Sequence, residues 1–272
     1  MTSAEPLLAT SGLTREFGGI TAVDDVDFAL ADGELCSVIG PNGAGKTTFF
    51  NLLTGVLEPT RGTVEFSPSD RDGRVDVTDA SPHETALLGL HRSYQITNVF
   101  PTVSVLENVR IAVQAHRGND TWRFWRNVHA FDDHFVEAER ILERIGLAES
   151  ADRPAETLSH GEKRSLEIGI ALAGDPDLLL LDEPTAGVSS EDVAQVTALI
   201  EDVAADHAIM LIEHNMDVVM GISDRVVVLD RGELIADSDP ATVRESEAVQ
   251  RAYLGGYEDD GASDAGAGVT AG

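Results

Sequence analysis

The sequence predicts an α/β fold with a helical insertion, and two observations carry this prediction. Short continuous apolar runs, typical of buried parallel strands, alternate with helical segments near both ends of the chain. The middle of the chain, from about Gln95 to Leu158, has a mostly helical pattern. Alternating strands and helices favour a largely parallel sheet, and the helical middle is then expected to be inserted into that core.

Local signals predict the individual elements in chain order. Strands are expected in "DGELCSVIG", "GTVEF", "DLLLL", "AIMLIEH" and "RVVVLD". The segment "GKTTFFNLLTGVLEP" has helical spacing of its apolar residues and ends at Gly55 and Pro59. Ser81 and Ser104 are each followed three residues later by glutamate, which predicts a capped helix start at both places. The segment "AERILERIGL" is amphipathic and is expected to be helical.

Length and composition limit the class of protein. A chain of 272 residues that is 42% hydrophobic can bury one sizeable core with an inserted subdomain. No apolar run reaches the roughly 18 residues that span a bilayer, and "MTSAEPLLATSG" lacks the features of a signal peptide. The single cysteine, Cys36, falls in a predicted strand and is expected to be a buried core residue. Residues 258–272 are acidic and rich in glycine and alanine, so we expect a disordered tail.

The net charge of −29 is the strongest compositional signal. Lys46 and Lys163 are the only lysines, and arginine supplies the other strong bases. Such a charge disfavours binding to nucleic acid, because phosphate binding requires neutralising cations. It also keeps a protein soluble in concentrated salt. We therefore expect a salt-adapted cytoplasmic protein without a nucleic-acid partner, and the alternative is an ordinary acidic protein.

A phosphate-binding loop follows the first of these predicted strands. The stretch "GPNGAGKT", Gly40–Thr47, fits G-x-x-x-x-G-K-[ST] and opens a predicted helix. Glycines let backbone amides face phosphate oxygens, and the helix N-terminus adds positive potential. Lys46 can bridge the β- and γ-phosphates, and Thr47 can offer a hydroxyl to Mg²⁺. The predicted nucleotide-binding residues here are Gly40, Pro41, Asn42, Gly43, Ala44, Gly45, Lys46, Thr47 and Thr48.

Two carboxylates follow the apolar run in "DLLLLDEP". Asp182 at the end of the strand can hold the magnesium ion, and Glu183 would point toward the γ-phosphate and orient an attacking water. The alternative is a plain strand-end turn with Pro184 as its breaker. With a phosphate loop in the same chain, the pair predicts a P-loop NTPase core that hydrolyses a nucleotide.

The stretch "LSHGEKRSLEIG" lies shortly before these carboxylates. Ser159 and Glu162 form a capping-box pattern, which leaves Gly161 unexplained. A helix N-terminus with a serine hydroxyl and a glycine amide is also an anion site. From these residues alone, the turn could be a helix cap, a phosphate-binding helix end, or both.

With these motifs, about residues 5–257 resemble the ATP-binding cassette (ABC) ATPases, the nucleotide-binding subunits of ABC transporters. Leu158–Glu162 stands where the family has Leu-Ser-Gly-Gly-Gln, with His160 and Glu162 as departures. The resemblance implies an ABC ATPase domain over residues 1–257, in which an antiparallel β subdomain accompanies the core and a helical subdomain is inserted at about 96–160. It also implies head-to-tail pairing of two chains, so that ATP lies between the phosphate loop of one and Ser159, Gly161 and Glu162 of the other.

Further family positions match residue by residue. Gln95 in "SYQITNVFP" resembles the glutamine that touches Mg²⁺ or water, although it could be an ordinary polar loop residue. His214 in "LIEHNMD" resembles the switch histidine that contacts the γ-phosphate. Phe17 in "REFGGITAV" resembles the aromatic residue that stacks on adenine, and its alternative is a core phenylalanine. The implied catalytic residues are Glu183, His214 and Lys46, and the implied metal ligands are Thr47, Gln95 and Asp182.

Several longer stretches resemble one branch of the family. "LEIGIAL", "LIEHNMDVVMGISDRVVVLDRGELIADSDP" and "VQRAYLG" resemble ATPase subunits of branched-chain amino acid transporters, and the insertion from Gln114 to Phe135 resembles the G-type subunit. Relatives that serve urea or short amides share these features, so the solute stays open between the two. The implied partners are two transmembrane permease subunits, a second ABC ATPase (identical or a sister chain) and, indirectly, an extracytoplasmic solute-binding protein. The implied location is the cytoplasmic face of the membrane, as a peripheral subunit.

Two alternatives remain at this stage. The segment "HRGNDTWRFWRNVHAF" gathers Trp122 and Trp125 among arginines, which favours a permease or headgroup contact or, alternatively, packing within the insertion. A soluble ABC protein of translation or DNA repair is the other class. Such proteins usually carry two cassettes, a coiled-coil or zinc insertion, or a basic surface, and this sequence shows none of these.

Overall fold

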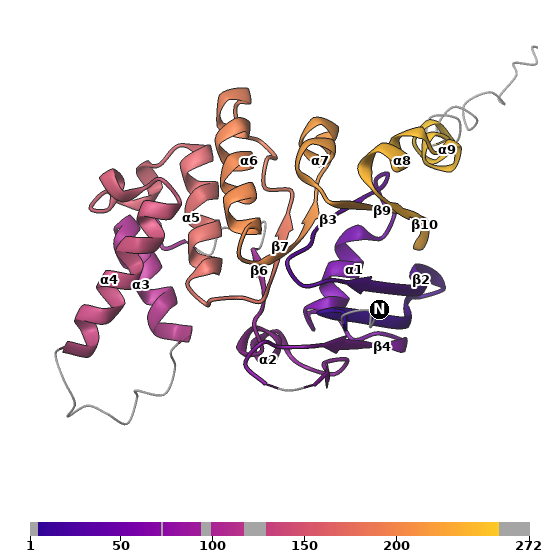
Figure 1. Cartoon of the computed structure of the whole chain (residues 1–272), viewed down its shortest axis with the longest axis horizontal. Coiled ribbons are helices and arrows are strands. Elements are labelled where there is room, and N and C mark those ends of the chain that lie inside the picture. Colours follow the sequence, from indigo (N-terminus) through magenta and orange to yellow (C-terminus); the bar gives the residue numbers. More distant parts are fainter. Residues whose placement is uncertain (1–4, 72, 94–98, 117–128, 256–272) are drawn as a thin grey trace, which may run out of the picture.

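A six-stranded, mostly parallel sheet forms the centre of the protein (Figure 1). The computed structural model describes residues 5–71, 73–93, 99–116 and 129–255. The strand order is β10-β9-β3-β8-β7-β6, and β10 alone runs antiparallel to its neighbour. The strands are β3 (Leu35–Ile39), β6 (Leu90–Ser93), β7 (Leu178–Asp182), β8 (Ala208–Ile212), β9 (Arg225–Asp230) and β10 (Glu233–Ser238).

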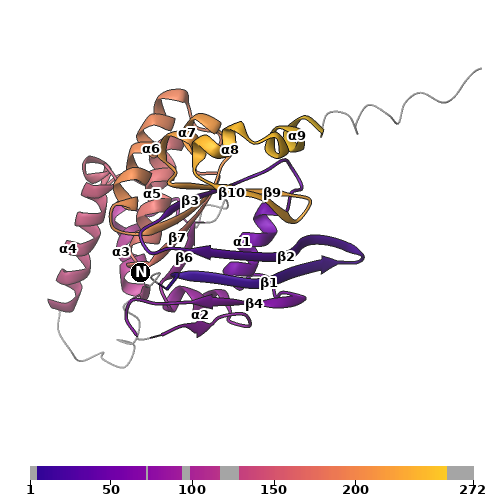
Figure 2. The same ribbon diagram turned by 45° about the vertical axis from the view of Figure 1, so that its right-hand side comes forward.

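A second, antiparallel sheet lies beside the first and has the order β2-β1-β4-β5 (Figure 2). Its strands are β1 (Leu8–Phe17), β2 (Ile20–Leu30), β4 (Arg61–Phe66) and β5 (Val75–Asp76). The amide of Asp24 in β2 donates to the carbonyl of Gly232, in the turn between β9 and β10, at 2.9 Å. This bond ties the two sheets together.

The strands β1 and β2 were not predicted by local patterns. Register shifts interrupt their pairing at three places, so the alternation of apolar and polar residues is broken. The turn Gly18–Gly19 between them was the available signal, since both glycines have positive φ and such pairs favour tight hairpins.

The helix α1 (Lys46–Leu53) fills the space between the two sheets. Its Phe49, Phe50 and Leu53 are fully buried against side chains of both sheets. Leu178 and Leu180 of β7 belong to this cluster, whereas Leu179 and Leu181 pack in the cluster on the opposite face. Strand β7 is therefore apolar at every position because both of its faces are covered.

Helices cover the face of the central sheet that is opposite α1 (Figure 1). They are α5 (His160–Leu172), α6 (Ser190–Ala204), α7 (Met216–Ile222), α8 (Pro240–Glu245) and α9 (Glu247–Gly255). The helix α2 (Pro82–Leu87) precedes β6 and has the predicted capping box at Ser81 and Glu84. The α/β class and the antiparallel subdomain expected from the sequence are both present.

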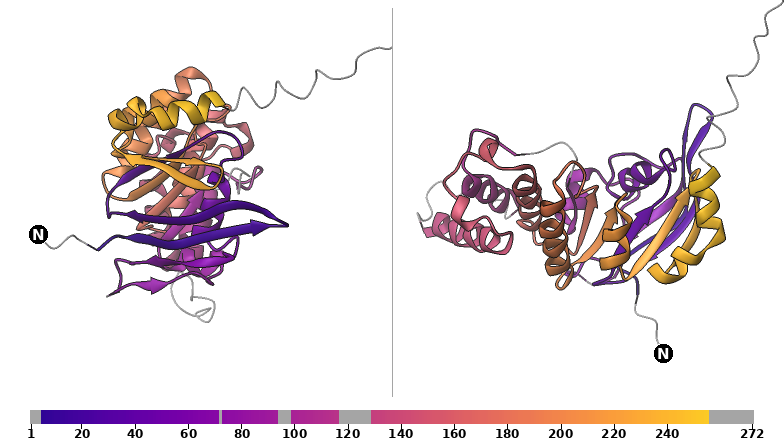
Figure 3. Two further views of the ribbon diagram at one scale, coloured as in Figure 1. Left: turned by 90° about the vertical axis from the view of Figure 1, so that its right-hand side faces the viewer. Right: turned by 90° about the horizontal axis from the view of Figure 1, so that it is seen from above.

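Two further helices, α3 (Val105–His116) and α4 (His129–Arg144), pack on α5 at the end of the molecule opposite α9 (Figure 3). Short 3-10 turns, η2 (Ala148–Ser150) and η3 (Ala155–Thr157), lead from them into α5. These helices fall within the predicted insertion at 96–160, whose exact limits stay a prediction.

Within the described residues, no helix is both long and apolar enough to cross a membrane. Cys36 is fully buried in β3, as expected, and burial raises the pKa of its thiol. Gln95, the cluster around Trp122 and Trp125, and the tail at 258–272 lie outside the described residues.

Candidate nucleotide site

The phosphate loop between β3 and α1 requires glycine at defined positions. Gly40 and Gly45 have φ angles of +151° and +101°. A Cβ on Gly40 would lie 2.0 Å from the carbonyl oxygen of Leu229, and one on Gly45 would lie 2.2 Å from the carbonyl oxygen of Ala22. The loop is thus pressed between the end of β9 and strand β2, and a side chain at either glycine would push it out of place.

Lys46 is the first residue of α1, and its ammonium group is folded back over the loop. The Nζ atom donates to the carbonyl oxygens of Gly40 at 2.7 Å and Pro41 at 3.0 Å. Burial lowers the pKa of Lys46, and the negative charges of Glu183 and Asp182 act in the opposite direction. The buried cation therefore lies close to both predicted carboxylates, with two carbonyl oxygens where phosphate oxygens could replace them.

Asp182 ends β7 next to a partner that no sequence motif predicts, the side chain of Arg92. Nη2 of Arg92, in β6, donates to Oδ2 of Asp182 at 2.7 Å, and Nη1 donates to Oδ1 of Asn51 at 2.6 Å. Arg92 also stacks over the ring of Phe50. The carboxylate predicted to hold magnesium is thus fixed by a buried arginine from the neighbouring strand.

Glu183 has a strained backbone, and both its amide and its carbonyl are hydrogen-bonded. Its φ angle is +49°, in the left-handed region that non-glycine residues rarely adopt. Its amide donates to the carbonyl of Ile212 at 2.8 Å, and its own carbonyl accepts from Nη2 of Arg164 at 2.9 Å. Such strain is typical of functional positions that the surrounding structure over-determines.

The carboxylate of Glu183 meets the predicted switch histidine. Nε2 of His214 lies 2.9 Å from Oε1 of Glu183. Because a carboxylate accepts hydrogen bonds, Nε2 carries the donated proton in this arrangement. The two residues are 31 positions apart and come together because β7 and β8 are adjacent and parallel and end at the same edge of the sheet.

The N-terminus of α5 has the predicted capping box. Oγ of Ser159 accepts from the amide of Glu162 at 3.1 Å, and Oε2 of Glu162 accepts from the amide of Ser159 at 2.7 Å. Arg153 lies 3.3 Å from the other carboxylate oxygen of Glu162. Ser159 is exposed, so the helix end is open to solvent.

Gly161 has a packing reason that sequence reasoning missed. A Cβ at this position would lie 2.7 Å from the Cβ of Asp192 in α6. The close approach of α6 to the first turn of α5 therefore requires glycine at position 161, whatever this turn binds.

Phe17 lies at the end of β1 with 42% of its surface exposed. The guanidinium carbon of Arg15 lies 4.7 Å from its ring centroid. This exposure excludes the core alternative for Phe17 and leaves the ring open to stacking. Thr47 is likewise exposed at the start of α1.

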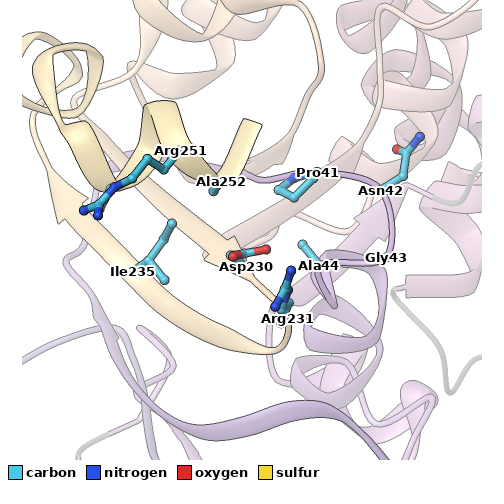
Figure 4. Close-up of a pocket in the computed structure, with 10 residues that line it drawn as sticks. Pro41, Asn42, Gly43, Ala44, Asp230, Arg231, Ile235, Arg251 and Ala252 are labelled. Carbon is cyan, nitrogen blue, oxygen red and sulfur yellow. The ribbon is translucent and has the colours of Figure 1, made fainter. Parts of the chain in front are cut away.

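A cavity of about 480 Å³ adjoins the phosphate loop (Figure 4). Its lining comes from four segments: Pro41–Ala44 of the loop, Asp230 and Arg231 at the end of β9, Ile235 of β10, and α9 with Arg251. Tyr253, also in α9, is half-buried, and burial raises the pKa of its hydroxyl while the nearby backbone of Gly40 acts in the opposite direction. Lys46, Asp182 and Glu183 do not line this cavity, which therefore lies beside the cluster of predicted catalytic residues rather than within it.

Residues 23–186, more than half of the chain, match the sequence pattern that defines the ABC transporter family. The chain belongs to the ABC transporter family. The cassette is 38% identical over 260 residues to the high-affinity branched-chain amino acid transport ATP-binding protein LivG of Escherichia coli (strain K12), covering 93% of this chain and 99% of that protein. It is 37% identical over 258 residues to the corresponding protein BraF of Pseudomonas aeruginosa, with the same two coverages.

Solved structures agree with this assignment. The cassette matches a nucleotide-free ATP-binding cassette from an ABC transporter with a TM-score of 0.77 and 27% identity, covering 91% of this chain and 98% of that one. The predictions of the family, of the α/β fold class and of an ATP-binding ATPase subunit of a transporter are confirmed by these matches. The roles of individual residues stay predictions.

Proposed function

We propose that this cassette hydrolyses ATP to drive a membrane importer for branched-chain amino acids. The relatives named above support the solute class, because their names describe high-affinity branched-chain amino acid transport. The observation that carries the hydrolytic part is the 2.9 Å hydrogen bond between Glu183 and His214, close to the buried ammonium group of Lys46.

The residues at the loop fit a nucleotide phosphate with Mg²⁺. Three glycines with positive φ shape the loop, and Gly40 and Gly45 lie where a Cβ would strike neighbouring backbone. The hydroxyl of Thr47 and the carboxylate of Asp182 are the hard oxygen ligands that magnesium prefers, and Gln95 is the third proposed ligand. When bound, the metal ion would neutralise charge on the phosphate oxygens.

Each residue of the cluster then has a defined task. The glycine-rich loop from Gly40 to Thr48 binds the phosphates, and Lys46 exchanges its two carbonyl acceptors for β- and γ-phosphate oxygens. Glu183 orients the attacking water and accepts its proton, because its carboxylate stands at the strand end next to the loop. His214 donates its single N–H, on Nε2, to that carboxylate, and we propose that this donation shifts to the γ-phosphate when ATP binds. The exposed Phe17 stacks on adenine.

The second half of the site is proposed to come from another cassette. Ser159 and Gly161 at the open N-terminus of α5 would bind the γ-phosphate held by the partner's loop. The carboxylate of Glu162 accepts from the amide of Ser159 and pairs with Arg153, so its proposed contribution is to shape this turn. The partners are a second ABC ATPase, identical or a sister chain, two permease subunits and, indirectly, a solute-binding protein.

We place this assembly at the cytoplasmic face of the membrane, with the cassette as a peripheral subunit. The net charge of −29 supports adaptation to a cytoplasm rich in salt, where counterions screen the repulsion between carboxylates. The same charge opposes an independent role on nucleic acid.

Purification of the tagged chain from its own membranes, in molar salt with ATP, tests this function. We expect two multi-spanning permeases and a second cassette to be recovered with it, and uptake of branched-chain amino acids to depend on the chain. If urea or short amides are taken up instead, the proposed solute class, branched-chain amino acids, is wrong. Recovery of ribosomal or DNA-repair proteins without permeases would overturn the transport function.

A further inference from the structure

A buried carboxylate, Glu213, lies between the two catalytic segments. It directly follows β8 and has 3% of its surface exposed. Its Oε1 accepts two hydrogen bonds from Thr185, one from the amide at 2.8 Å and one from Oγ1 at 2.6 Å. Thr185 is two residues after Glu183, so one oxygen of Glu213 holds the segment that leaves the catalytic glutamate.

The other oxygen of Glu213 holds the switch segment. Its Oε2 accepts from the amide of His214 at 2.9 Å and from the amide of Asn215 at 3.2 Å. The side chain of Asn215 in turn caps α7 by accepting from the amide of Asp217 at 3.1 Å. This second oxygen therefore fixes the backbone of His214 at the point where α7 begins.

The carboxylate chemistry suits this task. A carboxylate is an acceptor at both oxygens, and hydrogen bonds to an ionised acceptor are shorter and stronger than neutral ones. Here four donors from two segments converge on a single group. Removing the group would leave the buried amide of Thr185 and the part-buried amides of His214 and Asn215 without their acceptor, which is costly for the arrangement as a whole.

We propose that Glu213 is a positioning residue for ATP hydrolysis, which locks the segment at Thr185 and the backbone of His214 into one geometry. In that geometry Nε2 of His214 meets Oε1 of Glu183. Glu213 does not contact the nucleotide and acts through the other two residues. The inference rests on the proposed roles of Glu183 and His214 in hydrolysis.

The Glu213→Gln variant tests the proposal with little change in volume. The side-chain nitrogen of glutamine can donate but not accept hydrogen bonds. It would therefore lie against the hydrogen-bond donors of either Thr185 or His214 and leave them without an acceptor. We expect kcat for ATP to fall roughly 10- to 100-fold, as for a catalytic group displaced by about 1 Å. The KM for ATP and the affinity for the nucleotide are expected to stay within about twofold, because the phosphate loop is intact.

Thr185→Val probes the same interaction from the other side. It removes the Oγ1 bond to Glu213 and leaves the amide bond, so kcat should fall by less than in Glu213→Gln. Thr10→Val is the matched control, because Thr10 is also buried and its Oγ1 donates to the carbonyl of Val26 within the antiparallel sheet. We expect Thr10→Val to retain wild-type kcat. If Thr185→Val and Glu213→Gln, measured as separate variants, both keep the wild-type kcat, the proposal is overturned.

Hydrogen–deuterium exchange separates this inference from the proposed function. In Glu213→Gln we expect faster exchange in both segments, 183–189 and 213–217, and unchanged exchange in α2. If the wild-type chain hydrolyses no ATP, the proposed function fails, and the exchange result still decides whether Glu213 fixes the two segments. Unchanged exchange in both segments would overturn the positioning role. If Glu213→Gln does not fold, Thr185→Val takes its place in the test. Its kcat and its hydrogen–deuterium exchange are then compared with those of the control variant Thr10→Val.

Discussion

The guanidinium of Arg92 and the carboxylate of Asp182 form an ion pair in which both side chains are 5% exposed. The pair joins the two strands β6 and β7 at the edge where the proposed metal ligand is displayed. A buried ion pair is costly to break from one side, because the remaining charge loses its partner without regaining water.

We predict that Arg92→Met lowers the free energy of unfolding by about 3–5 kcal/mol, as is typical when one partner of a buried pair is removed. Denaturant titration followed by circular dichroism measures the change. Arg74→Met is the matched control, since Arg74 pairs with Glu65 at 3.3 Å on the surface, and such pairs contribute about 0–1 kcal/mol. Equal, small losses in both variants would contradict the structural role of Arg92.

Glu183→Gln should separate ATP binding from hydrolysis. The amide cannot take a proton from water, so we expect kcat to fall about 10²- to 10⁴-fold, the usual contribution of a general base. Nucleotide affinity is expected to persist, because the loop and Lys46 are untouched, and a closed dimer should accumulate with ATP in size-exclusion chromatography. Glu233→Gln, at an exposed carboxylate of β10, serves as the control. Wild-type turnover in Glu183→Gln would refute the assigned role.

The capping boxes at Ser159 and Ser81 offer a paired experiment on the start of α5. Both serine hydroxyls accept from the amide three residues on, and the backbone amide of each serine donates to the carboxylate of that glutamate. Replacing either with alanine should lower the free energy of unfolding by about 1 kcal/mol, the typical value of an N-cap. Ser159→Ala alone should also weaken ATP-dependent dimerisation, because its hydroxyl is proposed to reach the partner's γ-phosphate. If both variants dimerise like the wild type, Ser159 is a helix cap and nothing more.

Cys36 provides an internal probe of salt dependence. It is the single thiol, it is fully buried, and burial raises its pKa, so the folded chain keeps it protonated and inaccessible. We expect slow reaction with a thiol reagent in molar KCl and much faster reaction when salt is withdrawn, because unscreened carboxylates then repel one another. The Cys36→Ser variant supplies the blank. Slow labelling at both salt concentrations would count against halophilic adaptation.

Local sequence signals predicted the elements whose structural cause is local. The capping boxes at α2 and α5 form within four residues, and the apolar run of β7 reflects burial on both faces. The strands β1 and β2 escaped prediction because their pairing contains register shifts that break the alternation. The loop at Gly40 was predictable because its motif is continuous in the sequence.

The contacts that hold the site could not be predicted in the same way. Arg92 and Asp182 are 90 residues apart, and Gly161 meets Asp192 only because α5 and α6 pack closely. Glu213 lies next to a motif histidine, but its partner Thr185 comes from another strand end. Family resemblance predicted which residues act, whereas the tertiary structure identified the contacts that hold those residues in place.

Because lysine is scarce in this chain, a reagent that modifies amines can report on the phosphate loop. Lys46 and Lys163 are the only side-chain amines of the chain, and they lie at the two places proposed to meet across the dimer, the loop and the first turns of α5. The lowered pKa of Lys46 increases its fraction of free amine at a given pH, while its bonds to two carbonyls shield it. An acylating reagent followed by mass spectrometry therefore reports occupancy of the loop and closure of the dimer from two peptides, without any engineered probe.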